Sequence, residues 1–195
     1  MNKYNPSEHH RRSIRLPEYD YSQSGMYFIT ICTYQKQCLF GEINQGQMYL
    51  NQIGKMVAQE WLNSAKIRQE ITLDEWIIMP NHIHGIVIIE KETDFNQGIN
   101  HQKGASLAPL QGGRKPRSLS SFVGGFKSAV TKRIKAISTE PNPPVWQRNF
   151  YESIIRNEQK LWQIREYILN NPYRWQQDPE KLQHQKQELL IDLIM

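Results

Sequence analysis

Two histidines one residue apart are the part of this sequence best suited to chemistry. His82 and His84 follow the dipeptide Pro80-Asn81 and open an apolar, β-branched run that ends at Ile89. In an extended strand, side chains two positions apart point to the same face, so the two imidazoles point together and Ile83 points away. Neutral imidazole is the commonest protein ligand of divalent metals. The pair therefore indicates two arms of a metal site, although two hydrogen-bonding residues at a strand entrance give the same pattern.

A tyrosine and an asparagine further along the chain are suited to complete such a site. Tyr167 lies in a helix predicted over 158–170, and Asn171 follows four residues later. Because positions i and i+4 are neighbours on a helix surface, the two side chains are expected on one side. The Asn171 oxygen is a candidate third ligand, and the Tyr167 hydroxyl is a candidate nucleophile toward a phosphate that a cation orients. A surface tyrosine and an asparagine that ends a helix before Pro172 fit the same spacing.

Positive charge is concentrated in two parts of the chain, which has a net charge of +5 and a pI near 9.2. One part is the N-terminal segment, and the other is a stretch without any acidic residue between Asp94 and Glu140. Such segments attract a phosphate backbone, so we expect a nucleic-acid partner, with a solvated basic face as the alternative. Trp146 is a candidate for stacking on exposed bases, or else a core residue. The candidate phosphate contacts are Arg11, Arg12, Arg15, Arg114, Lys115, Arg117, Lys127, Lys132, Arg133, Arg148 and Arg156.

The elements that must position these residues follow from hydrophobic periodicity and from turn and capping residues. We expect Ser118 and Asn157 to cap two of the helices. The order of strands and helices predicts an α+β fold, with an antiparallel sheet covered by helices on one face in a ferredoxin-like arrangement. The predicted elements are a strand at 26–34, a hairpin at 39–50, a helix at 52–66, strands at 76–79 and 83–89, a helix at 118–136, a short strand at 152–156 and a helix at 158–170.

Length and composition indicate one globular domain. We expect residues 1–24 to form a basic arm, 25–175 a single domain with an insertion loop at 91–117, and 176–195 a C-terminal tail. No apolar run approaches the roughly 20 residues of a membrane helix, and the first residues lack the apolar core of a secretory signal. Since Cys32 and Cys38 are the only cysteines, we expect no disulfide framework and a cytoplasmic, bacterial location.

Three blocks of sequence in a fixed order carry a resemblance to a known family. They read MPNHIHG at 79–85, WQRNFYESIIRNE at 146–158 and REYILNNPYRW at 165–175. Over most of its length, from about residue 26 to 175, the chain resembles the HUH single-strand DNA transposases. It resembles most closely their branch of REP-associated tyrosine transposases.

The resemblance implies a function as well as a ferredoxin-like fold. It implies a divalent metal, Mg²⁺ or Mn²⁺, on His82, His84 and Asn171, with Tyr167 as the nucleophile. The expected partner is single-stranded DNA with a hairpin. The expected reaction is a nick that leaves a 5′-phosphotyrosine and a free 3′-hydroxyl, followed by strand transfer.

Several alternatives stay open from the sequence. Tyr151 is a second tyrosine beside basic residues and is a rival nucleophile. A non-catalytic protein that binds hairpin or repeat DNA would need the same recognition surface without the chemistry. A small hydrolase that activates water on a two-histidine metal would not need Tyr167. Both a monomer and a homodimer are compatible with the sequence.

Overall fold

The computed structural model describes residues 20–21, 23–90, 116–138 and 144–176. Its centre is a four-stranded antiparallel sheet in the order β4-β5-β1-β6. Helix α1 joins β1 to β4, and helix α2 lies between β5 and β6 in the chain, which gives the β-α-β-β-α-β order of a ferredoxin-like fold. The predicted α+β fold is therefore confirmed. The elements are β1 (Gly25–Cys32), α1 (Gln52–Lys66), β4 (Ile71–Met79), β5 (His82–Ile89), α2 (Leu119–Ile137) and β6 (Tyr151–Ile155).

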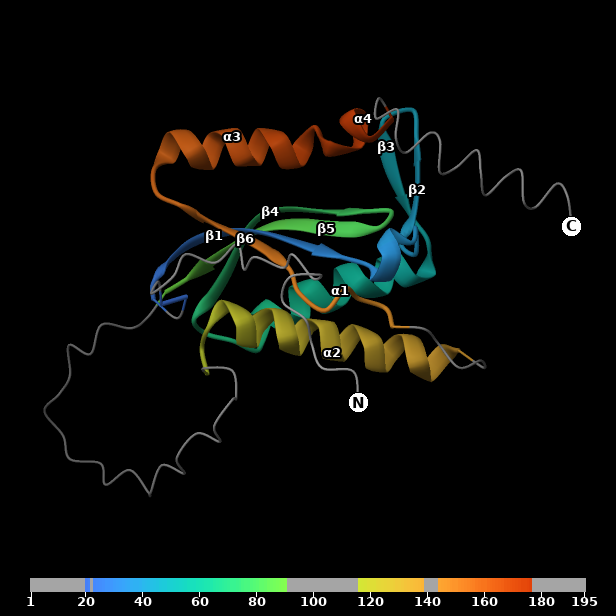
Figure 1. Ribbon diagram of the computed structural model, residues 1–195, viewed down its shortest axis with the longest axis horizontal. Coiled ribbons are helices and arrows are strands. Elements are labelled where there is room, and N and C mark those ends of the chain that lie inside the picture. Colours follow the sequence, from blue (N-terminus) through green and yellow to red (C-terminus); the bar gives the residue numbers. More distant parts are fainter. Residues whose placement is uncertain (1–19, 22, 91–115, 139–143, 177–195) are drawn as a thin grey trace, which may run out of the picture.

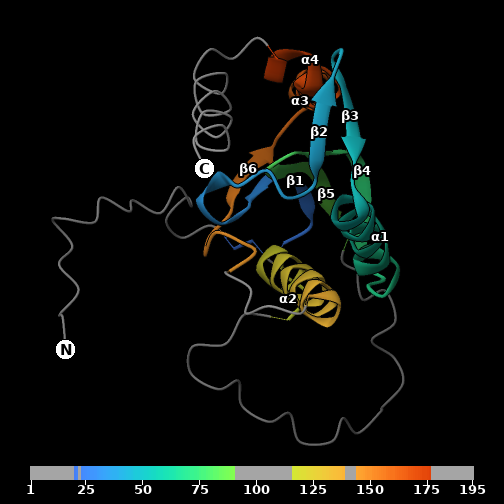
Figure 2. The same cartoon turned by 90° about the vertical axis from the view of Figure 1, so that its right-hand side faces the viewer.

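Helices cover both faces of this sheet, whereas the sequence pattern predicted helices on one face. Figures 1 and 2 show α1 and α2 on one side and α3 (Glu158–Leu169) on the other. The larger core lies between the sheet and α1 and α2, and a smaller one joins Ile86 and Ile155 of the sheet to Ile164 and Ile168 of α3. The prediction was wrong for α3 because apolar residues on both faces of a strand do not reveal which helix covers which face.

Strand alternation decides which side chains meet which helix layer. In β5, Ile83 and Val87 belong to the core beneath α1 and α2, whereas Ile86 packs beneath α3. His82 and His84 have the same parity as Ile86, so both imidazoles lie on the α3 side, as the His-x-His spacing predicted. The sequence of one strand thus fixes that the two histidines share a face, and α3 then covers that face.

Capping residues set the beginnings of the helices. The Asn51, Ser118 and Asn157 side chains accept hydrogen bonds from the backbone amides of Gly54, Ser121 and Lys160. Each bond satisfies an amide that has no partner within its helix. The predicted caps at Ser118 and Asn157 are confirmed, and the register of α3, which carries Tyr167, is therefore fixed locally.

The C-terminal helix differs from its prediction. Helix α3 ends at Leu169, with Asn170 as its C-cap, and a short helix α4 (Asn171–Gln176) begins directly afterwards. Asn171 and Tyr167 therefore belong to different helices, and the i, i+4 argument does not fix their relative direction. Pro172 lies in the first turn of α4, where its missing N–H costs nothing, so it begins a helix instead of ending one.

A small hairpin and one turn of 3₁₀ helix complete the described structure. The hairpin consists of β2 (Gly41–Asn44) and β3 (Gln47–Leu50), and it confirms the hairpin predicted at 39–50. The 3₁₀ turn at Tyr34–Lys36 follows β1. No helix within the described residues is long and apolar enough to cross a membrane. Most of the predicted arm at 1–24, of the insertion at 91–117 and of the tail at 176–195 lies outside the described residues.

We expect Gly85→Ala to lower the free energy of unfolding by about 1–3 kcal/mol. A Cβ at this position would lie 2.7 Å from Cζ2 of Trp61, which is fully buried and has little room to move. Denaturant unfolding measures the loss. Gly25→Ala is the matched control, since its Cβ would meet Tyr27 at an ordinary 3.4 Å. Equal stability of the two variants would contradict the close packing of β5 on α1.

Candidate active site

The two histidine rings converge on one point on the α3 side of the sheet. His82 and His84 open β5, and their Nε2 atoms lie 3.0 Å apart. The ring centroids are 4.4 Å apart with an edge-on arrangement. His84 is 5% exposed, while His82 is half-buried. The structure therefore brings together the two imidazoles that the His-x-His spacing indicated as arms of a metal site.

Asn81 fixes which nitrogen of His82 carries the proton. The Asn81 Nδ2 group donates to the Lys36 carbonyl at 2.9 Å, which turns Oδ1 toward His82 Nδ1 at 2.7 Å. Since the amide oxygen only accepts hydrogen bonds, His82 Nδ1 must donate. The lone pair of His82 is therefore on Nε2, directed at His84. Asn81 is itself held, because Thr33 donates its N–H and its hydroxyl to the Asn81 carbonyl at 2.9 and 3.0 Å.

Thr30 and Phe28 of β1 hold the His84 ring. Thr30 is the cross-strand partner of His84, and its Oγ1 lies 2.8 Å from His84 Nδ1. Phe28 stacks on the same ring with centroids 5.4 Å apart. With Nδ1 engaged by Thr30, His84 Nε2 is the nitrogen directed at His82. In both rings Nδ1 is thus engaged by a neighbouring side chain, and Nε2 is directed at the other ring.

This arrangement fits a divalent cation. Ligand nitrogens sit about 2.1 Å from a bound metal, so two of them at right angles lie about 3 Å apart, as found here. A proton on His84 Nε2 would instead make the same 3.0 Å contact a hydrogen bond to His82 Nε2, because the Thr30 hydroxyl can either donate to or accept from His84 Nδ1. Hydrogen-bonded outer nitrogens are typical of metal-binding histidines. Within the described residues, no group of three or more histidine, cysteine, aspartate or glutamate side chains is placed to hold a metal. Among the described residues, a third ligand would therefore be a side chain of another type, such as an amide, and water or substrate could also take this position.

Tyr167 brings a hydroxyl to the same point. It lies on α3, and its Oη is 3.3 Å from His84 Nε2. Its ring packs against His84 and Phe28 with centroid distances of 5.2 and 6.0 Å, and the Arg174 guanidinium lies 5.6 Å above it. The phenol is thus oriented by contacts on several sides, with its oxygen at the histidine pair.

Asn171 follows Tyr167 by four residues, but its side chain forms no hydrogen bond with His82 or His84. Its side chain is 7% exposed in α4, and it makes no hydrogen bond to any other described residue. A neighbour in α4, Trp175, does reach the site, because its ring lies 5.7 Å from that of His82. The role of Asn171 as a third ligand stays a prediction.

Tyr151, the rival nucleophile, lies at the start of β6 and is 40% exposed. It pairs with Thr30 across the strands and contacts Phe28 edge-on at 6.2 Å. It therefore shares the face of the site, but Phe28 and Thr30 separate it from the histidines in the sheet. The geometry favours Tyr167.

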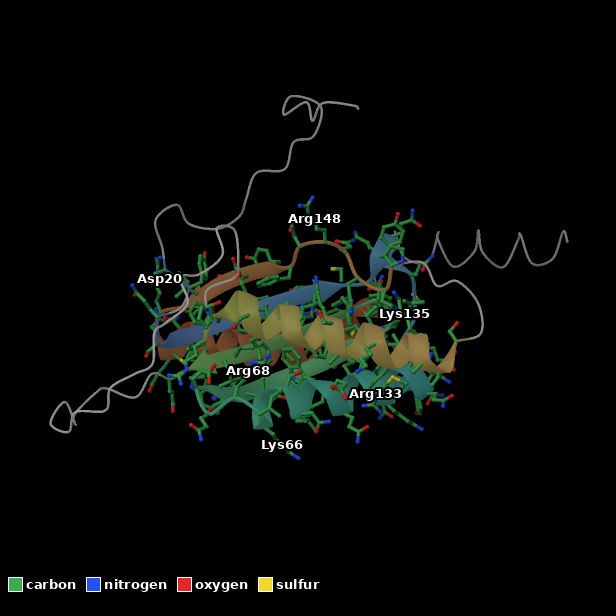
Figure 3. All side chains as sticks on the ribbon, turned by 90° about the horizontal axis from the view of Figure 1, so that it is seen from below. Asp20, Lys66, Arg68, Arg133, Lys135 and Arg148 are labelled. Atoms are coloured by element: carbon green, nitrogen blue, oxygen red, sulfur yellow. The ribbon has the colours of Figure 1, made fainter. Side chains whose placement is uncertain are left out.

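The candidate phosphate contacts are spread over the molecule. Lys132 and Arg133 lie on α2, on the face of the sheet opposite the histidines, and Figure 3 shows Arg133 and Lys135 on that side. Arg133 is held by Glu60 and Gln59 of α1 at 2.6 and 3.0 Å. Arg117, Arg148 and Arg156 are exposed, and the last two flank β6. Arg11, Arg12, Arg15, Arg114 and Lys115 lie outside the described residues.

Two of the candidate DNA-binding residues, Lys127 and Trp146, make contacts that hold the fold together. Lys127 donates from Nζ to the Gln147 and Asn149 carbonyls at 2.7 and 3.0 Å, so it holds the segment before β6. Trp146 is 8% exposed, packs on Phe40 and Phe126, and donates to the Lys127 carbonyl. Trp146 is therefore a core residue and not an exposed stacking platform, which corrects that prediction.

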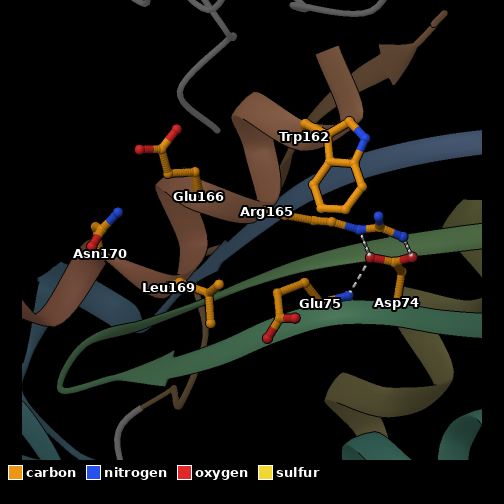
Figure 4. Close-up of a pocket in the computed structure, with 7 residues that line it drawn as sticks. All are labelled: Asp74, Glu75, Trp162, Arg165, Glu166, Leu169 and Asn170. Atoms are coloured by element: carbon orange, nitrogen blue, oxygen red, sulfur yellow. Dashed lines mark hydrogen bonds and ion pairs between the residues drawn. The ribbon is translucent and has the colours of Figure 1, made fainter. Parts of the chain in front are cut away.

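An ion pair ties α3, the helix that carries Tyr167, to the edge of the sheet. Arg165 of α3 donates from Nε to Asp74 Oδ1 of β4 at 2.8 Å and from a second nitrogen to Oδ2, as Figure 4 shows. The hydrogen bonds from Arg165 lower the pKa of Asp74 below its ordinary value of 3.8, against the opposing effect of burial. Arg165 is two residues from Tyr167, so this pair helps to fix the position of the phenol.

The Asp74 pair predicts an acid dependence of stability. Because the pKa is lowered in the folded state, the stabilisation is complete above the ordinary carboxyl pKa and is lost as the pH falls through the folded value. We expect Asp74→Asn to lower Tm by a few degrees at neutral pH and to approach the wild type as the pH falls through the folded pKa of Asp74, which lies below 3.8. Thermal unfolding at several pH values measures this. A Tm difference that is independent of pH would contradict it.

Thr30 gives a further prediction. Thr30→Val keeps a β-branched side chain but removes the oxygen next to His84 Nδ1, and we expect Mn²⁺ affinity to fall by about 10–100-fold. Electron paramagnetic resonance titration of Mn²⁺ measures this without any enzymatic assay. Thr131→Val is the matched control, because it removes a threonine hydrogen bond to the Lys127 carbonyl on α2, beneath the other face. Unchanged affinity in Thr30→Val would argue against His84 as a ligand.

Sequence reasoning missed the residues that orient the histidines. Asn81 carried a usable signal, since it directly precedes His82 and an amide at a strand entrance commonly bonds to a neighbour. Thr30, Phe28 and Trp175 carried none, because they reach the site only through strand register and the position of α4. These contacts are properties of the tertiary structure.

Comparison with solved structures defines the class of fold. The chain superposes on the structure of a REP-associated tyrosine transposase bound to a REP hairpin with a TM-score of 0.55 and 18% identity, over 83% of this chain and 74% of that one. The chain therefore shares its α+β fold with that structure. A candidate transposase from Deinococcus radiodurans matches with a TM-score of 0.43 and 14% identity, over 81% and 97% of the two chains, which is too little to carry an argument.

Comparison of sequences shows the family. The chain is 45% identical over 176 residues to an uncharacterized protein of Haemophilus influenzae, with 90% of this chain and 96% of the relative covered. The chain belongs to the same family as that protein. No model of a known protein family matches the sequence.

Proposed function

We propose that this protein is a divalent-metal-dependent enzyme that nicks single-stranded DNA at hairpins and transfers the strand through a 5′-phosphotyrosine. One observation carries the proposal: the Tyr167 hydroxyl lies 3.3 Å from His84 Nε2, which lies 3.0 Å from His82 Nε2. A nucleophile and a cation-binding pair at one point suit attack on a phosphodiester. The fold shared with a tyrosine transposase supports the assignment.

The proposed reaction conserves the phosphodiester bond energy. The Tyr167 oxygen forms a bond to phosphorus, the bond from phosphorus to the 3′-oxygen breaks, and the 5′ end stays on the protein. The phenol proton passes to solvent, and the leaving 3′-oxygen takes up a proton. A 3′-hydroxyl of a second strand then attacks the phosphotyrosine in the reverse sense and restores a phosphodiester.

His82 and His84 would hold the divalent cation, Mg²⁺ or Mn²⁺, with Asn171 proposed as a third ligand. When bound, the cation would neutralise charge on the phosphate oxygens. Asn81 and Thr30 keep the two Nε2 atoms aimed at this point, and Phe28 and α3 restrict the approach of water. Arg148 and Arg156 are exposed and flank β6, and such cations could hold phosphates of the strand.

A denaturing gel tests the proposal. Labelled hairpin DNA with single-stranded flanks, taken from sequence around the gene, is incubated with the protein and Mg²⁺ or Mn²⁺. We expect a slowly migrating, protease-sensitive protein–DNA adduct that requires the metal. Tight binding without an adduct on any hairpin would contradict the proposal and favour a protein that only recognises DNA.

A further inference from the structure

The outward side of α3 carries two large exposed apolar side chains. Trp162 is 65% exposed and Leu169 is 62% exposed, whereas Ile164 and Ile168 of the same helix are buried. Trp162, Glu166 and Leu169 follow the i, i+4, i+7 spacing of a single helix stripe. Because each residue turns the helix by 100°, this stripe lies roughly opposite Ile164 and Ile168 on the helix surface. Tyr167 is not part of the stripe. No described element covers the stripe, so a partner could bind there without disturbing the site.

An open hollow borders this stripe. It has a volume of about 770 Å³ and lies between α3 and β4, with Trp162 at one end and Leu169 and Asn170 toward the other. Figure 4 shows Glu75 of β4 facing these residues across the hollow. One copy of the chain thus offers both a protruding indole and a recess with an apolar wall.

Charge decides which partner suits this surface. Asp74, Glu75 and Glu166 line the hollow with Arg165 as the only cation among its lining residues. Arg165 is engaged by Asp74, while Glu75 and Glu166 form no ion pair with any other described residue. An excess of carboxylates repels a phosphate backbone, so nucleic acid is disfavoured here. A partner that presents a large apolar side chain and a guanidinium is favoured.

We propose that this partner is a second copy of the chain, with the two α3 helices packed antiparallel about a two-fold axis between Arg165 and Glu166. Under this symmetry Trp162 lies opposite the partner's Leu169 and enters the partner's hollow. Arg165 lies opposite the partner's Glu166 and can contact it while held by Asp74, because Asp74 accepts from only two of its three nitrogens. Each contact is made twice, as in an isologous interface. The stripe is thus complementary to itself in both shape and charge.

Sedimentation of the full chain without DNA tests the proposal. We expect a concentration-dependent dimer whose Kd rises at least about 30-fold in Trp162→Ala, because a central tryptophan is a typical hot spot. Glu166→Arg, which places like charges opposite each other, should also weaken the dimer. Gln163→Ala, an exposed residue of α3 off the stripe, is the matched control and should leave Kd unchanged.

Disulfide trapping tests the register of the pair in a Cys38→Ser background. Two Glu166→Cys residues would lie about 1.5 Å apart along the helix axes, whereas two Lys160→Cys residues would lie about 17 Å apart. We expect mild oxidation to link the first variant and not the second. A monomer at all concentrations, or a dimer insensitive to both stripe substitutions, would overturn the proposal. A monomer whose Trp162→Ala variant binds single-stranded DNA more weakly would overturn it in favour of base stacking.

Discussion

Tyr167→Phe should abolish the covalent adduct between this protein and hairpin DNA. The substitution removes only the oxygen that we propose forms the bond to phosphorus, and the ring contacts with His84 and Phe28 remain. We expect adduct formation to fall by at least about 10³-fold, because loss of a nucleophile removes the covalent step itself. Gel quantification of the adduct measures this, and a filter-binding assay on the same samples should show that hairpin DNA is still bound.

Tyr151→Phe is the matched control, since it removes a hydroxyl from the same face of the sheet. We expect this variant to form the adduct at the wild-type level. Loss of the adduct in Tyr151→Phe alone would assign the nucleophile to Tyr151. Cleavage that continues in Tyr167→Phe, with free 5′ ends, would instead indicate a hydrolase that uses water.

His84→Ala should have the second largest effect. We expect adduct formation to fall by at least about 100-fold even at high Mn²⁺, because substitution of residues that merely orient metal ligands already costs 10–100-fold. His84 contacts Thr30, His82, Tyr167 and Phe28 together, so its removal disconnects the whole site. Adduct yield and Mn²⁺ binding by electron paramagnetic resonance should fall together, and His82→Ala should behave alike.

Ser153→Ala is the control for His84→Ala. Ser153 pairs with Phe28 on the same face of the sheet but belongs to β6. We expect wild-type Mn²⁺ binding and adduct yield from this variant. An adduct that forms in His84→Ala with no metal present would show that the histidines do not bind a catalytic cation, even if Tyr167 is the nucleophile.

Local signals in the sequence predicted most of the elements. The helix at 52–66 has the predicted bounds, and Ser118 and Asn157 cap their helices as expected. These features depend on residues close together in the chain, so they can be read without tertiary information. One exception is β4, which begins at Ile71 and not at 76. Another is α4, where Pro172 begins a helix although a proline after a periodic segment usually indicates an end.

The sequence by itself determined that His82 and His84 share one face, because the period of a β-strand is two. It could not determine that Thr30 would hold His84, since that contact depends on the register between β1 and β5. Nor did it show that α3 would cover the histidine face and bring Tyr167 to it, or that Trp146 would be buried. Periodicity reports the direction of a side chain within its own element. Only tertiary packing decides which element lies opposite, because that choice depends on the total apolar surface buried and not on any local pattern.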